Sequence, residues 1–446
     1  MQEYLTIILF GGFLLLLFIG APITVSLAGA SMFAYLVLDK NPIALVQIAF
    51  TSVGNFPLMA LPAFILAGAL MEAAGISKRL VDIAETLAGP VTGGLGAATV
   101  MACLFFGAIS GSGPATTAAV GMLMVPAMVK RDYDKSYASA VTAASGGLGI
   151  IIPPSIPLVI FGIAALGLSA PPEAVAKYGT FDTLSITKLF VAGVIPGFIM
   201  ASTLVLTNYI ISKRKGYRGL SNQWALSSVG YAFRRGFWSI LAPFLILGGI
   251  YSGMFTQTES AVVAIFYSLV VGFFIHRQLS MNRVLDSLLT TTRISGRGLL
   301  ILFAASVFGR LLIEQRIPVA VADSLLGLTD NMYLVWSMMI MLLLFVGMFM
   351  ETLAAIMIIV PVLLPIMYML GADPTHVGIV VVCTLSIGFA TPPLGENIFV
   401  ASGVGGATVE QITAKIHPFV ITSVFGVFLI AFFPALRLWL PRLVGF

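Results

Sequence analysis

Several long apolar stretches of this sequence are interrupted by glycine and proline, and this combination restricts the fold more than any other feature. The clearest case is GAISGSGPATTAAVG, residues 107–121, which lies between the apolar runs 95–106 and 122–129. Of the 446 residues, 59% are hydrophobic and 9% are charged. A soluble domain has about 25% charged residues, and a helix of about 17–25 apolar residues crosses a bilayer. The sequence therefore predicts an all-α polytopic membrane protein.

The remaining composition excludes several classes of function. The N-terminal MQEYLTIILFGGFLLLLFIGAP has no basic segment before its apolar run, so we expect a retained membrane helix rather than a cleaved signal. Cys103 and Cys383 lie in apolar sequence without Cys-x-x-Cys spacing, which favours free, packed thiols over a metal or redox site. Basic residues that orient membrane helices explain the net charge of +5, and no pattern indicates nucleic-acid binding.

The chain contains two copies of one pattern. Three sets of residues match at a spacing of 239 positions: Pro126 and Pro365, Gly149 and Gly388, and the Pro-Pro pairs at 153–154 and 392–393. Paired prolines are rare in apolar segments, so the sequence predicts two repeats, 1–212 and 234–446, joined by a basic linker at 213–233. The predicted hairpin and broken helix are 94–129 and 136–168 in the first repeat, and 331–370 and 376–404 in the second.

The distribution of basic residues indicates the topology. If each hairpin enters and leaves on one side, each repeat crosses the membrane five times, so the repeats are inverted. A cytoplasmic linker then places both termini in the periplasm, with most of the 23 basic residues on the inner side, as the positive-inside rule requires. The inner set is Lys78, Arg79, Lys130, Arg131, Lys135, Lys213, Arg214, Lys215, Arg218, Arg234, Arg235, Arg277, Arg283, Arg293, Arg297 and Lys415. Inverted repeats with interrupted helices are typical of secondary transporters, whose sites lie near the midplane.

The interruption at residues 110–115, SGSGPA, is predicted to be a buried hairpin tip. Two glycines and a proline cannot continue the helix, and non-helical backbone is tolerated at membrane depth only inside protein or along a wet cavity. Such a tip offers carbonyl oxygens to a small cation and helix N–H groups to an anion. We expect the breaks in 145–162 and 386–403, and the second hairpin within 346–367, to converge on the same plane.

Small residues and acids in apolar sequence allow two interpretations. Glycine and serine in membrane helices commonly serve close packing, but a symmetry-related set of breaks favours a site. Glu351 and Glu396 are functional candidates because burying a charge is costly, whereas Glu259 is equally consistent with a helix boundary. Residues 76–90 place apolar and charged side chains on opposite faces of a helix, which predicts an amphipathic helix at the membrane interface.

Five segments carry a resemblance to a known family. They are GAISGSGPATTAAVG, IIPPSIPL, GMFTQTESA, MYLVWSMMIMLLLFVGMFMETLAAIMIIVPVLLPI and ATPPLGENIFVASGV. From Leu5 to Pro441 the chain resembles the large membrane subunit (DctM or SiaM type) of tripartite ATP-independent periplasmic transporters. The resemblance implies an elevator in the bacterial inner membrane that imports a carboxylate-bearing solute, sialic acid or another organic acid, with sodium. It also implies two partners: a small four-helix subunit of DctQ type, expected as a separate chain, and a periplasmic substrate-binding protein.

The same resemblance implies site residues. One sodium would be held by Ser110, Gly111 and Ser112 with Ile152 and Pro153, and a second by Glu351 and Thr352 with Thr391, Pro392 and Gly395. Substrate contacts would come from Thr116, Glu396 and Asn397. Residues 107–121 and 145–162 contain no titratable side chain, which favours sodium over a proton as the bound cation. Many members of the family carry an aspartate just after the first tip, where this chain has Pro114-Ala115-Thr116, and this form resembles the sialic-acid-type members more than the dicarboxylate type.

Two other classes remain open. A stand-alone ion-coupled carboxylate transporter would share the hairpins and need no binding protein. An intramembrane serine protease could use Ser110 or Ser112, but it needs a histidine base nearby. The three histidines, His276, His376 and His417, are expected at helix ends or in loops, so no enzymatic activity is predicted.

Overall fold

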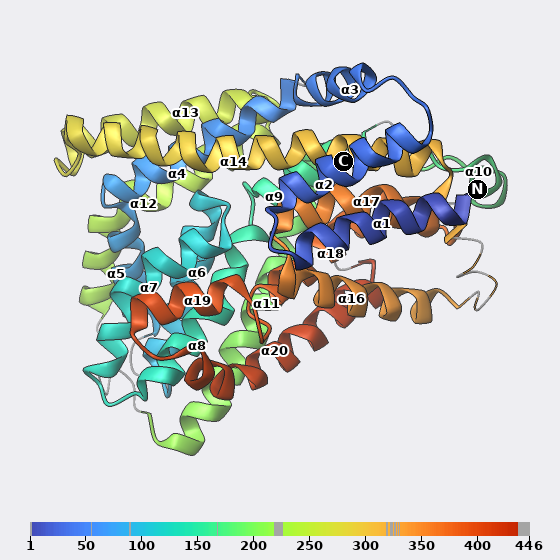
Figure 1. Cartoon of the computed structure of the whole chain (residues 1–446). Helices are drawn as coiled ribbons and strands as arrows, with labels where there is room; N and C mark the ends of the chain where they lie inside the picture. The colour runs from blue at the N-terminus through green and yellow to red at the C-terminus, as the bar shows by residue number, and fades with distance from the viewer. Residues whose placement is uncertain are drawn as a thin grey trace.

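A computed structural model describes residues 2–435, apart from 55, 89–90, 167, 218–225, 318–319, 322–323, 325–326, 328 and 330. Within these residues every secondary-structure element is helical, which confirms the predicted all-α fold (Figure 1). Seven described helices are long and apolar enough to cross a membrane, or eight if the bent pair Ala60–Ala73 and Ile76–Ala88 forms one span. The chain is therefore a multi-pass membrane protein.

The first half begins with two apolar helices and ends with a long one. Its longer helices are α1 (Gln2–Phe18), α2 (Ile23–Val37), α3 (Ile43–Val53), α4 (Ala60–Ala73), α5 (Ile76–Ala88), α6 (Gly94–Ser110), α7 (Gly113–Val129), α8 (Lys135–Gly146), α9 (Ile156–Ala165) and α11 (Ile186–Lys215). Shorter elements are the 3-10 helices η1 (Phe56–Met59) and η2 (Gly147–Ile150), and α10 (Pro172–Tyr178). The predicted first hairpin thus consists of α6 and α7, and the broken helix of α8, η2 and α9.

The second half follows the same order. Its helices are α12 (Leu226–Tyr251), α13 (Gln257–Val270) with the π-helical turn η3 (Val271–Ile275), α14 (Met281–Glu314), α16 (Met332–Phe349), α17 (Thr352–Met369), α18 (Pro374–Gly388), α19 (Glu396–Gly405) and α20 (Val409–Phe432). Asp134 caps the N-terminus of α8 and Asp373 caps that of α18, at the spacing of 239 residues found in the sequence. Parts of the linker 213–233 and of the segment between α14 and α16 lie outside the described residues.

The two hairpins approach the centre of the molecule from opposite ends. In Figure 1 the α6–α7 hairpin lies in the left half and the α16–α17 hairpin in the right half. The broken helices cross between the halves, because α19 packs against α7 and α8 while α9 packs against α17. These contacts join hairpins and broken helices into one packed unit.

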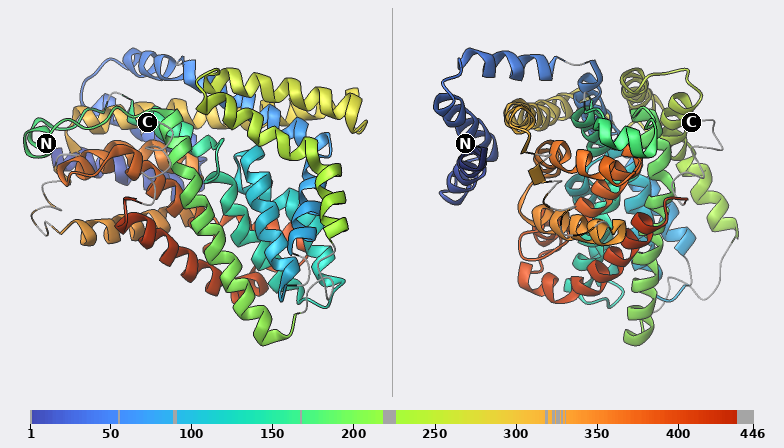
Figure 2. Two further views of the ribbon diagram at one scale, coloured as in Figure 1. Left: turned by 180° about the vertical axis from the view of Figure 1, so that it is seen from behind. Right: turned by 90° about the vertical axis from the view of Figure 1, so that its right-hand side faces the viewer.

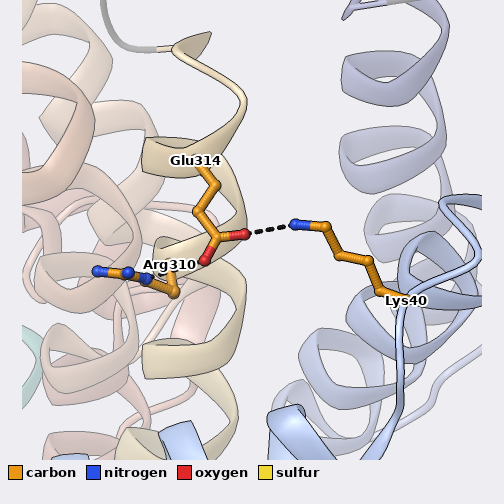
Figure 3. Close-up of polar contacts among 3 residues, drawn as sticks. All are labelled: Lys40, Arg310 and Glu314. Carbon is orange, nitrogen blue, oxygen red and sulfur yellow. Dashed lines mark hydrogen bonds and ion pairs between the residues drawn. The ribbon is translucent and has the colours of Figure 1, made fainter.

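The remaining helices surround this unit. Helix α14 packs against α2, α3, α4 and α17, and Figure 2 shows α1–α3 at the edge of the molecule. An ion pair links the loop after α2 to the end of α14, with Lys40 Nζ 2.7 Å from one Glu314 oxygen and Arg310 Nε 3.0 Å from the other (Figure 3). Such exposed pairs contribute at most about 1 kcal/mol, so apolar packing holds α14 in place.

Helix α5 is the amphipathic segment that the sequence predicts. It bends 69° away from α4 and packs against α6 and α12. Its buried face includes Ile76, Leu80 and Ile83, whereas Lys78 and Asp82 are exposed. This division of side chains is the one expected for a helix that lies along a membrane surface.

Two pairs of glycines allow close helix contacts inside the unit. A Cβ built on Gly107 would lie 2.7 Å from the Cα of Gly149, and one built on Gly388 would lie 2.7 Å from the Cα of Gly347. Each pair joins the first arm of a hairpin to the broken helix of the same half. Side chains larger than hydrogen would force these backbones apart, as in other small-residue contacts between membrane helices.

We predict that Gly388→Ala destabilises the protein. The added methyl group meets backbone rather than a flexible side chain, and overpacking of this kind costs about 1–3 kcal/mol. Gly403→Ala on α19 is the matched control, because no atom lies within 4 Å of a Cβ built there. Melting temperatures of the purified protein in detergent measure the effect. A Gly388→Ala variant as stable as Gly403→Ala would contradict the glycine contact.

Candidate transport site

A cavity of about 320 Å³ lies where the two hairpin tips and the two helix breaks meet. Its walls include the first tip, Ser110–Ala115, and the second tip, Glu351–Leu353. Helices α4 and α14 supply the opposite wall. A second cavity of about 500 Å³ adjoins the first and shares Arg297, Glu351, Phe389 and Glu396 with it. Residues of both hairpin tips and both helix breaks therefore line one cavity, as the sequence predicts.

The first tip is shaped by the residues that stop the helix. Helix α6 ends at Ser110, and Gly111 adopts φ +60°, a left-handed conformation that favours glycine. Ser112 is extended and caps α7, whose first turn contains Pro114. The C-terminal end of one helix and the N-terminal end of the next thus lie side by side at the cavity.

Three oxygen atoms gather behind this tip. The hydroxyl oxygens of Ser110 and Thr116 are 2.8 Å apart, and the Thr116 hydroxyl donates to the Ser112 carbonyl at 2.7 Å. Thr116 is fully buried. A Cβ built on Gly149 would lie 2.3 Å from the Thr116 hydroxyl and 2.6 Å from the Ser112 carbonyl, so a larger residue at position 149 would clash with the cluster. Hydroxyl and carbonyl oxygens at a helix end are suitable ligands for a hard cation such as sodium.

The first helix break approaches the tip through residues just after those named from the sequence. A Cβ built on Gly111 would lie 2.9 Å from the Pro154 carbonyl and 3.3 Å from the Ile156 nitrogen. Ile152 instead packs against Gly197 of α11, and neither Ile152 nor Pro153 lines the cavity. Ser110, Gly111 and Ser112 therefore line the cavity together, whereas Ile152 and Pro153 of the first break do not line it.

The second tip is built differently. Glu351 precedes α17 at the position equivalent to Ser112, but its side chain makes no capping hydrogen bond and lines both cavities. Thr352 also lines the first cavity, and its buried hydroxyl has no partner in the described part of the chain. Thr391 donates to the Ile387 carbonyl at 2.7 Å.

The predicted second sodium site includes three further residues, from the second helix break. Thr391, Pro392 and Gly395 line neither cavity. Gly395 packs against its own segment, with a built Cβ 2.5 Å from the Phe389 carbonyl. Of the residues predicted for the second sodium, only Glu351 and Thr352 line the first cavity.

Of the residues predicted to contact substrate, Glu396 alone lines the cavity. Thr116 belongs to the oxygen cluster. Asn397 is fully buried, its side-chain amide donates to the Ala143 carbonyl at 3.1 Å, and its Oδ1 has no partner among the described residues. Asn397 therefore joins α19 to α8, across the two halves.

Two charged residues of the site were missed in the sequence. Arg297, which the sequence places among the residues on the inner side of the membrane, lies within α14 and lines both cavities. An apolar run begins directly after Arg297, so the sequence predicts the membrane boundary at this residue. Glu72 of α4 also lines the cavity. A signal for both was available in the sequence, because each is a charged residue within or next to an apolar run.

The charge of the cavity follows from these positions. Among the residues that line it, Glu72, Glu351 and Glu396 are acidic and Arg297 is the one cation. No histidine is among these lining residues, and the Ser110 hydroxyl is hydrogen-bonded to Thr116. The arrangement offers oxygen ligands to a cation at the first tip and a guanidinium group to an acid group at Arg297.

Comparison with known proteins identifies relatives over nearly the whole chain. Residues 10–436 match the family model of the tripartite ATP-independent periplasmic transporter, DctM component. The chain is 40% identical to the isethionate TRAP transporter permease protein DctMQ of Oleidesulfovibrio alaskensis, over 97% of this chain and 66% of that protein.

Two further relatives have similar length. The chain is 34% identical to the C4-dicarboxylate TRAP transporter large permease protein DctM of Rhodobacter capsulatus, over 98% of this chain and 99% of that protein. It is 34% identical to the sialic acid TRAP transporter large permease protein SiaM of Vibrio cholerae, over 97% of each chain.

Solved structures support the fold. The YdaH transporter of Alcanivorax borkumensis, described as having an unusual topology, superposes with a TM-score of 0.62 over 88% of this chain and 87% of that chain, at 14% identity. The chain belongs to the DctM family, the large permease component of tripartite ATP-independent periplasmic transporters.

Proposed function

We propose that this chain is the membrane subunit that imports an organic acid together with sodium, by an elevator movement in the bacterial inner membrane. The observation that carries the proposal is the cluster of Ser110, Ser112 and Thr116 oxygens beside a cavity that contains Arg297. In this function a periplasmic binding protein delivers the solute, a small DctQ-type subunit completes the membrane complex, and both termini are periplasmic.

The names of the relatives support the substrate class. They refer to isethionate, C4-dicarboxylates and sialic acid, which are all organic acids that carry a negative charge. Arg297 is suited to an acid group, because a guanidinium donates two parallel hydrogen bonds to a carboxylate or a similar oxyanion. Sialic acid is one member of the proposed substrate class.

Coupling between sodium binding and solute binding follows from the charges around the cavity. Three acids face one arginine, so an organic anion that enters alone adds to a negative excess. Sodium at the first tip offsets this charge, and each ligand then raises the affinity for the other, typically 5- to 150-fold, or about 1–3 kcal/mol.

The packing suggests which parts move. Both hairpins and broken helices form one unit through the contacts of α19 with α7 and of α9 with α17. Arg297 and Glu72 reach the cavity from α14 and α4, outside that unit. We propose that the unit moves against α14 and α4, carrying the solute past them.

The acids of the cavity favour a second candidate, in which a proton replaces sodium. Glu72, Glu351 and Glu396 are titratable groups that line the cavity, whereas the oxygen cluster has none. The two candidates differ in the residues on which the driving ion depends, so mutation separates them.

We predict that uptake follows sodium and not pH. The assay uses proteoliposomes that contain the chain with its small subunit and are supplied with loaded binding protein. Thr116→Val removes one oxygen of the cluster and is expected to weaken sodium binding. A loss of about 1.4 kcal/mol of binding free energy would raise the sodium concentration for half-maximal uptake about tenfold. Thr117→Val is the control, because the Thr117 hydroxyl bonds within its own helix to the Gly113 carbonyl.

Two results would contradict this proposal. Full uptake driven by a proton gradient without sodium, and abolished by Glu72→Gln, would favour the proton. Robust uptake of free solute without the binding protein would favour a stand-alone transporter.

We further predict that Arg297→Gln weakens solute binding. The loss of a charge-assisted hydrogen bond, about 1.5–3 kcal/mol, corresponds to a roughly 10- to 150-fold higher half-saturating solute concentration. Arg297→Lys keeps the charge but not the paired donors and should lie in between. Arg293→Gln, one turn earlier on α14 and outside both cavity linings, is the matched control. An Arg297→Gln variant with unchanged solute dependence would exclude Arg297 from the site.

A further inference from the structure

A groove of about 510 Å³ runs between α5 and the start of α12, away from the transport cavity. Arg79, Asp82 and Thr86 line it from one face of α5, and Ser228, Tyr231 and Arg235 line it from α12. The two helices touch beside it, where a Cβ built on Gly236 would lie 2.3 Å from the Ile83 side chain. We call this space the α5–α12 groove.

The groove carries two positive charges and one negative charge. In the described residues neither Arg79 nor Arg235 forms an ion pair. Arg79 donates to the Gly75 carbonyl at 3.0 Å, and the Arg235 guanidinium lies 5.5 Å from the centre of the Tyr231 ring. Both guanidinium groups therefore keep donors for an anion, and the hydroxyl groups of Ser228 and Tyr231 lie in the same lining.

Aromatic side chains indicate the depth of this groove in the membrane. Tyr231, Phe233, Phe237 and Trp238 are all exposed on α12 around Arg235, with Tyr231 62% exposed. Exposed tyrosine and tryptophan beside arginine are typical of the level of the lipid headgroups. The amphipathic helix α5 forms the other wall at the same level.

We propose that the α5–α12 groove binds the phosphate of an anionic phospholipid. Arginine pairs bind phosphate with several charge-assisted hydrogen bonds, and basic pockets at the cytoplasmic side of membrane helices favour anionic headgroups. A free phosphate ion would satisfy the same donors, but the surrounding aromatic side chains favour the lipid. The bound lipid would brace α5 against α12, at the edge of the helices that surround the moving unit.

Native mass spectrometry of the full chain in detergent tests this proposal. The protein is titrated with phosphatidylglycerol and, in parallel, with phosphatidylcholine. We expect tighter binding of phosphatidylglycerol, and a loss of about fivefold in its affinity for each of Arg79→Gln and Arg235→Gln. Arg235→Lys should retain most of the affinity, and it keeps the test informative if a glutamine variant is unstable.

Arg234→Gln is the matched control, because Arg234 is exposed on the same turn but does not line the groove. Its phosphatidylglycerol affinity should stay within about twofold of the original. Equal affinity for the two lipids, or an equal loss in Arg234→Gln and Arg235→Gln, would overturn the proposal. Displacement of phosphatidylglycerol by millimolar inorganic phosphate would assign the groove to a free anion and would also overturn it.

Discussion

Backbone that leaves a helix inside a membrane must be covered by protein, because lipid offers its N–H and C=O groups no partner. This chain has such backbone at two hairpin tips and two helix breaks. Each half covers the exposed backbone of the other, since α19 packs on α7 and α8, and α9 packs on α17. The contacts between Gly107 and Gly149, and between Gly347 and Gly388, bring these segments close enough to exclude lipid. The halves are therefore mutually dependent.

The same constraint produces the site. A helix that ends at depth exposes the partial charges of its terminus, and two termini lie side by side at each tip. At the first tip these charges are joined by the hydroxyl groups of Ser110 and Thr116 and the carbonyl of Ser112. Arg297 reaches the same cavity from α14, which belongs to the surrounding helices. A ligand in this cavity thus contacts both the packed unit and the helices around it, as the proposed elevator movement requires.

The sequence was sufficient to predict the helices, the breaks and the first tip, because glycine and proline in apolar runs have few structural alternatives. It was less informative about which side chains face the cavity. Thr116 points into the oxygen cluster, and Ile152 turns toward α11, because helix packing decides the direction of a side chain after a break. Arg297 directly precedes an apolar run, a position that indicates a membrane boundary, and the structure adds that Arg297 lines the cavity.

The most direct test of this account is the thermal stability of the purified protein in sodium chloride and in choline chloride at equal ionic strength. A ligand that binds the folded protein alone raises its stability by RT ln(1 + [L]/Kd), about 2.7 kcal/mol at a hundredfold excess over Kd. If the enclosed helix ends form a sodium site, the melting temperature rises with sodium and saturates, without any solute present. Identical melting temperatures in the two salts at all concentrations would contradict the central claim that the interrupted helices assemble a cation site.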